Sequence, residues 1–139
     1  MRHVIAAVLA ALVLVGACST GGSDAPETPR YTPVPDETIF SSIRAIPGVE
    51  RADLSFNGTT PSHSYLARIT VADGADAQTV LDTIYAKLWQ GRRGADITLE
   101  AQQAGAVVRL DAFEGGPVTR RLLQKRYGPQ PGDGTPPDD

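Results

Sequence analysis

His63 is the residue that most invites a catalytic interpretation, because it stands between Ser62 and Ser64. A serine hydrolase brings together a nucleophile, a histidine base and an orienting acid, and in one large class the nucleophile sits in a Gly-x-Ser-x-Gly turn. The sequence has no such turn. His63 falls between two predicted strands, where exposed polar residues are common. We therefore expect an exposed loop histidine, and a hydrolase with an unrecognised site is kept as an alternative.

Metal and carboxylate chemistry have few candidate residues. The chain has two histidines, one cysteine and no Asp-x-Asp-x-Asp-Gly loop, so we expect no metal and no cofactor. Glu100 and Asp111 could supply the carboxylate pair of a glycoside hydrolase. Arg109 is predicted to face Glu100, however, and would favour its ionised form, whereas a general acid must be protonated. The sequence therefore predicts no enzymatic activity.

Basic residues occur in doublets toward the C-terminus. If the last predicted helix lies near the turn at residues 91–94, the doublets form one patch that could bind anionic lipid headgroups or cell-wall polymer. The alternative is a solvated surface whose charges compensate helix C-termini. The formal net charge of −3 gives no general attraction to nucleic acid. The doublets are Arg92-Arg93, Arg120-Arg121 and Lys125-Arg126.

Cys18 is the only cysteine, so it cannot form an internal disulfide. It follows an unbroken apolar run at residues 4–15, which is shorter than the roughly 20 residues of a membrane-spanning helix. The segment Leu14-Val15-Gly16-Ala17-Cys18 resembles the lipobox of bacterial lipoproteins. An ordinary secretory signal with a chance cysteine is the alternative.

The lipobox resemblance implies that residues 1–17 are a signal peptide cut between Ala17 and Cys18. It also implies that a diacylglycerol on the Cys18 sulfur holds the chain at the extracytoplasmic face of a cell membrane. Removal of Arg2 with the signal peptide would change the formal charge from −3 to −4. Ser19 is not the aspartate that retains some lipoproteins at the inner membrane, so the choice of membrane stays open.

The rest of the chain divides into a linker, one domain and a tail. Residues 18–35 carry the cysteine and a Pro-, Gly- and Ser-rich spacer that cannot bury a core. If fully extended, the spacer could hold the domain up to about 55 Å from the membrane, at ~3.1 Å per residue. Residues 36–127 form the predicted domain, and residues 128–139 read as a disordered acidic Pro/Gly tail.

Hydrophobic periodicity predicts the elements of the domain. Asp36 is expected to cap a helix that Pro47-Gly48 terminates, and Asp73 or Asp76 to cap a second helix that Gly91 ends. Strands are expected around residues 51–57, 65–71, 96–101 and 108–112, and a short last helix over residues 117–127 that packs on the domain or docks loosely.

Strand registers support two hairpins. Pairing Phe56 with Tyr65 sets Asp53 opposite Arg68, and a turn at Ala104-Gly105 sets Ala101 opposite Val108 and Glu100 opposite Arg109. The expected fold is α+β: two αββ units that form a four-stranded antiparallel sheet with both helices on one face. This order is a circular permutation of the ferredoxin-like pattern and is similar in outline to BON domains of bacterial envelope proteins.

The other sheet face is then open. We expect Trp89 at the edge of the core, and Phe113 either on the open face or under the last helix. The favoured interpretation is a non-enzymatic binding module for another envelope component, with an electrostatic cell-wall or anionic-lipid module as an alternative. The expected outward residues are Arg51, Asp53, Leu66, Arg68, Thr70, Glu100, Arg109 and Asp111.

Overall fold

The computed structural model describes residues 32–59 and 63–138. The predicted signal peptide, Cys18 and the linker up to residue 31 lie outside these residues. Within the described part, no helix is long and apolar enough to cross a membrane.

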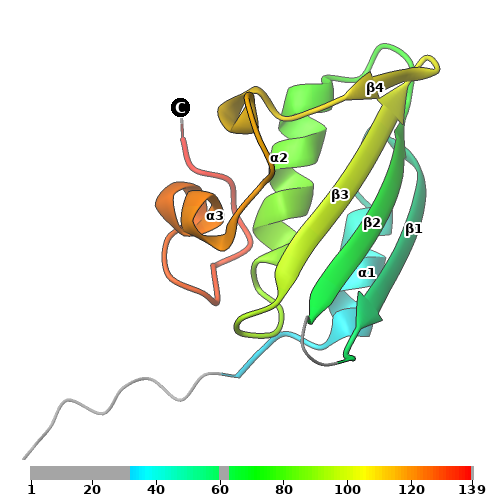
Figure 1. Cartoon of the computed structure of the whole chain (residues 1–139). Coiled ribbons are helices and arrows are strands. Elements are labelled where there is room, and N and C mark those ends of the chain that lie inside the picture. Colours follow the sequence, from blue (N-terminus) through cyan, green and yellow to red (C-terminus); the bar gives the residue numbers. More distant parts are fainter. Residues whose placement is uncertain (1–31, 60–62, 139) are drawn as a thin grey trace, which may run out of the picture. The chain divides into compact units, whose positions relative to one another are not determined.

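The domain is an α+β fold with a four-stranded mixed sheet and three α-helices (Figure 1). The strands lie in the order β1-β2-β3-β4. In Figure 1, α1 and α2 lie behind the sheet and α3 lies beyond α2. The elements are α1 (Asp36–Arg44), β1 (Val49–Asn57), β2 (Ser64–Val71), α2 (Ala77–Leu88), β3 (Asp96–Gln103), β4 (Ala106–Val108), the 3₁₀ turn η1 (Asp111–Phe113) and α3 (Arg120–Tyr127).

The prediction of a purely antiparallel sheet is wrong. The β1–β2 and β3–β4 pairs are antiparallel, but β2 and β3 are parallel over their whole length. The reason is the connection: α2 carries the chain back along the sheet before β3 begins, and strands joined by such a helical crossover run parallel. The two αββ units are therefore joined through a βαβ crossover at the centre of the sheet.

One face of the sheet forms the core with the helices. In β2, the buried side chains of Tyr65, Ala67, Ile69 and Val71 alternate with more exposed ones, as a half-buried strand requires. Ile39, Phe40 and Ile43 face them from α1, and α2 buries a longer apolar stripe that runs from Val80 to Leu88. The predicted periodicity thus identified the apolar faces of these elements.

Two helix boundaries differ from the prediction. The N-cap of α1 is Pro35, and Asp36 makes no side-chain cap, because its carboxylate is occupied by tertiary contacts described below. Gly91 does not end α2 as a left-handed residue, since the cap is Trp89 in the helical region. Asp76 caps α2 as predicted and accepts from the Gln78 and Thr79 amides.

The predicted register is confirmed for β1–β2, including Phe56 with Tyr65 and Asp53 with Arg68. In the second hairpin, Ala101 pairs with Val108 as predicted, but β4 ends there. The Gln78 side chain donates to the Arg109 carbonyl and accepts from the Asp111 amide, at 2.9 and 2.8 Å. These contacts tie the chain after β4 to α2, and no pairing of Arg109 with Glu100 is formed.

The chain after β4 turns toward the helices. Phe113 is buried and packs edge-on against Tyr85 and Tyr127, so it does not lie on the open sheet face. Leu123 of α3 is buried, with Val118 and Leu122 packed against the core, which confirms the packed alternative for the last helix. The C-terminal segment after α3 contacts the end of α2. Along it, Gly128 accepts from the Trp89 indole and Gly132 donates to the Trp89 carbonyl.

Candidate functional site

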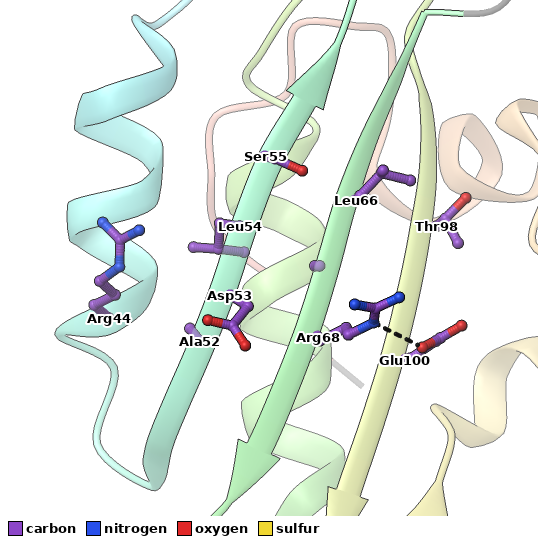
Figure 2. A pocket seen from close by; sticks show the side chains of 10 residues that line it. Arg44, Ala52, Asp53, Leu54, Ser55, Leu66, Arg68, Thr98 and Glu100 are labelled. Carbon is purple, nitrogen blue, oxygen red and sulfur yellow. Dashed lines mark hydrogen bonds and ion pairs between the residues drawn. The ribbon is translucent and has the colours of Figure 1, made fainter.

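The outer face of the sheet carries a row of alternating charges. Asp53, Arg68 and Glu100 lie in register on β1, β2 and β3, so a positive side chain stands between two negative ones. Figure 2 shows the three side chains on the same side of the sheet, with Arg68 reaching toward Glu100. The Arg68 Nε lies 3.3 Å from Glu100 Oε2, and the Arg51 Nε lies 3.5 Å from Asp53 Oδ2.

These charges balance within the face. All four side chains of the two ion pairs are more than 60% exposed, so each pair is worth at most about 1 kcal/mol. Leu66 and Val107 are the exposed large apolar side chains of the described part, and both lie on strands of this sheet. We call the surface formed by Arg51, Asp53, Leu66, Arg68, Glu100 and Val107 the outer sheet face.

The outer sheet face is hollowed beside the edge strand β1. A cavity of about 320 Å³ is bounded there by the charged row and by Arg44 at the end of α1. Leu66 lines it from β2, on the same side of the sheet as Arg68, whereas the side chains of Ala52 and Leu54 point from β1 toward α1 (Figure 2). A hollow with an exposed leucine beside a charged row is suited to an extended or looped polypeptide more than to a compact metabolite.

Arg109 and Asp111 are less central than predicted. Both side chains are exposed, but Arg109 follows the end of β4 and Asp111 begins the 3₁₀ turn. Glu100 pairs with Arg68 on the neighbouring strand instead of with Arg109. The candidate carboxylate pair is therefore split between a strand and a turn.

Asp36 belongs to a first polar triad that the sequence did not reveal. Its carboxylate accepts from the Tyr65 hydroxyl at 2.8 Å and from the Arg92 guanidinium at 2.8 and 3.1 Å. The Arg92 amide in turn donates to the Tyr65 hydroxyl at 3.0 Å. Arg92 also stacks 4.5 Å above the Phe56 ring. Burial raises the pKa of Tyr65 far above its ordinary value, with a further contribution from Asp36.

Asp82 belongs to a second triad of the same composition. Its carboxylate is 7% exposed and accepts two hydrogen bonds from Arg126, at 2.8 and 2.7 Å, and one from the Tyr127 hydroxyl. Burial, and then the hydrogen bond to Asp82, raise the pKa of Tyr127 far above its ordinary value. A charged residue on the apolar side of α2 was the available sequence signal, because a buried carboxylate needs a partner.

The basic doublets separate in the structure. Arg92 and Arg126 are committed to the two triads, whereas Arg93, Arg120 and Arg121 surround one concavity of about 470 Å³. Its remaining walls are Trp89, Gly94, Gln124, Pro129 and Gln130. We call this hollow the basic concavity. Lys125 is exposed and does not line it.

Two further candidate residues are His63 and Trp89. His63 is exposed, and its ring lies 6.3 Å from that of Phe56, while its backbone carbonyl accepts from Asp96. Trp89 is buried, as expected for a residue of the core. No group of three or more His, Cys, Asp or Glu side chains within the described ranges could hold a metal ion.

The chain was compared with protein families, curated proteins and solved structures. No family model, no curated protein and no solved structure matches the chain significantly.

Proposed function

We propose that this chain is a membrane-anchored, extracytoplasmic lipoprotein whose domain is a non-enzymatic binding module. In this proposal a diacylglycerol on Cys18 holds the chain in the membrane, and the outer sheet face binds a protein of the cell envelope. The observation that carries the binding role is the charged row Asp53, Arg68 and Glu100, fixed across three strands beside exposed apolar side chains.

The anchoring role is supported by the position of the one cysteine. Cys18 follows the apolar run and small residues of a lipobox, and the Pro-, Gly- and Ser-rich segment after it is suited to a tether. Two acyl chains on one residue give stable anchoring, where a single chain gives marginal binding.

The choice of a protein partner follows from the charge balance of the outer sheet face. Alternating charges held on a rigid sheet can specify a partner with the opposite alternation, because like charges placed together cost several kcal/mol. The exposed side chains of Leu66 and Val107 would supply apolar area that excludes water. A uniformly anionic polymer would meet Asp53 and Glu100 as well as the arginines, so this face is poorly suited to it.

The test is crosslinking of the tagged full-length chain in living cells, followed by identification of the captured protein. We expect one discrete protein, lost in the variant Arg68→Glu. Lys125→Glu on α3 is the matched control, because it changes the net charge equally on an exposed residue away from the face. Capture that persists in Arg68→Glu would contradict binding through the outer sheet face.

The anchoring half is tested separately with Cys18→Ala. We expect this variant to lose metabolic labelling with radioactive palmitate. Labelling that survives the substitution would contradict lipidation at Cys18, whatever the crosslinking shows.

A further inference from the structure

The basic concavity is assembled from three separate segments. Arg93 and Gly94 come from the turn after α2, Arg120 and Arg121 from the start of α3, and Gln130 from the C-terminal segment. Specific hydrogen bonds hold the segments together. Arg120 donates to the Gly94 carbonyl at 3.1 Å, and Gln130 both accepts from the Gly94 amide at 2.9 Å and donates to the Arg92 carbonyl at 3.0 Å.

The charge of the basic concavity is one-sided. Three arginines line it and no acidic residue does. Outside the lining, Asp96 lies 3.2 Å from Arg120 and balances part of its charge, and Asp36 binds Arg92. Arg93 and Arg121 are exposed. Guanidinium groups gathered around a hollow match the geometry and charge of a phosphate group.

The chain enters the domain beside this concavity. The Val34 amide donates to the Gln90 carbonyl at 3.2 Å, two residues before Arg92 and three before Arg93. Any tether that precedes Val34 therefore leads to the end of the domain that carries the arginines. Figure 1 shows the same end of the molecule, where the first described residues run under the turn between α2 and β3.

We infer that the basic concavity binds the phosphate of an anionic phospholipid headgroup in the membrane to which the chain is anchored. This inference rests on the proposed anchoring at Cys18. Contact at this end would hold the domain on the membrane surface and leave the outer sheet face presented to a partner. The occupant is a lipid headgroup and not a soluble phosphate, because the tether brings the concavity to a surface where headgroups are concentrated.

A weak site is sufficient for this role. A tethered domain meets the membrane as an intramolecular partner, so the effective concentration of headgroups at the site is high. Each cation near an anionic leaflet strengthens binding about fivefold, and the effect falls off within a Debye length, roughly 8 Å at physiological salt. Arg93 and Arg121, which are both exposed, therefore suffice to bias the orientation of the domain.

The test uses the full chain, produced in a lipoprotein-processing bacterium and placed in lipid nanodiscs. One set of discs contains phosphatidylcholine alone, and the other contains one third phosphatidylglycerol. Backbone hydrogen exchange is measured across residues 91–94 and 119–124. We expect exchange there to slow severalfold in the anionic discs, with little change in the central sheet, and to recover at high salt.

Charge reversal tests whether the arginines of the basic concavity bind the headgroup. The variant Arg93→Glu with Arg121→Glu should lose the slowing in anionic discs. The matched control, Arg44→Glu with Arg109→Glu, changes the net charge equally at exposed positions outside the concavity and should keep it. Exchange in detergent alone checks that both variants are folded.

The outcomes separate this inference from the anchoring. A chain that carries no lipid by mass spectrometry and fails to enter the discs would contradict the anchoring. A lipidated chain in the discs whose exchange is the same in both lipids overturns the phospholipid site alone. Slowing on addition of inorganic phosphate to the phosphatidylcholine discs would assign the concavity to a soluble phosphate and also overturn it.

Discussion

The outer sheet face and the basic concavity display charge in opposite ways. On the sheet face, Arg68 and Glu100 lie 3.3 Å apart on neighbouring strands, and the charges cancel locally. In the concavity, three arginines surround one hollow with no acid in its lining. Locally balanced charge gives short-range specificity for one partner, whereas one-sided charge gives salt-dependent attraction to any anionic surface. One small domain thus presents two surfaces suited to different kinds of partner.

The two surfaces also differ in how they are held. The sheet face rests on continuous backbone ladders between β1, β2 and β3. The concavity depends on side-chain contacts among three segments, chiefly the Asp82 triad and the hydrogen bonds of Gln130. The comparison predicts that single substitutions can dismantle the concavity while the sheet face survives.

The largest loss of folding stability is expected for Asp82→Ala. The substitution breaks the buried ion pair with Arg126 and removes the acceptor of the Tyr127 hydroxyl, and breaking such a pair costs about 3–5 kcal/mol. Urea denaturation should show this loss, and hydrogen exchange should show α3 exchanging faster than β2. If the free energy of unfolding falls by less than about 1 kcal/mol, Asp82 does not hold α3.

Gly91→Ala should cause the next largest loss of folding stability, because Gly91 is buried against the Tyr65 side chain. A Cβ atom built at Gly91 would lie 2.2 Å from the Tyr65 hydroxyl oxygen, inside the Asp36 triad. Overpacking of this kind costs about 1–3 kcal/mol. Gly116→Ala is the control, since nothing lies within 4 Å of its Cβ and its φ is not in the left-handed range. Equal unfolding curves for the two variants would show that Gly91 tolerates a side chain.

The tyrosines predict a loss of stability in alkali. Burial raises the pKa of Tyr85 to about 12 and those of Tyr65 and Tyr127 further, whereas an unfolded tyrosine titrates near 10. Above pH 10 the unfolded chain loses phenol protons that the folded chain keeps, so stability falls with rising pH. Each tyrosine contributes up to about 1.4 kcal/mol per pH unit.

Tyr127→Phe separates the contribution of the α3 triad. Between pH 10 and 11 the free energy of unfolding of the variant should fall by about 1 kcal/mol less than that of the unmodified chain, because one titrating phenol is gone. A slope identical to that of the unmodified chain would show that the Tyr127 pKa is not raised in the fold.

Local periodicity was sufficient to predict the sheet face, and insufficient to predict the concavity. The alternation in β1 and β2 fixed which side chains point outward, and the Phe56–Tyr65 register followed from it. Asp82 and Arg126 are 44 residues apart, and no periodic pattern links them. The contacts that assemble the concavity are of this kind, so they become visible only in the folded chain.

The parallel β2–β3 pair was predictable, because a strand–helix–strand connection of this length is normally a crossover. The early end of β4 was not. After β4 the chain is held to α2, where the Gln78 side chain binds backbone groups at Arg109 and Asp111. A long-range side-chain contact of this kind leaves no mark on hydrophobic alternation.

The smallest contribution to the free energy of unfolding is expected for the Arg68–Glu100 pair. Its measurement separates recognition by the outer sheet face from folding stability. Both side chains are more than two-thirds exposed, so a double-mutant cycle with Arg68→Ala and Glu100→Ala should give a coupling energy below about 1 kcal/mol in urea denaturation. If the outer sheet face binds a partner, the same substitutions should weaken its capture far more than they weaken the fold. A coupling above about 2 kcal/mol would instead make the pair part of the folding energetics. Loss of capture could then no longer be attributed to recognition alone.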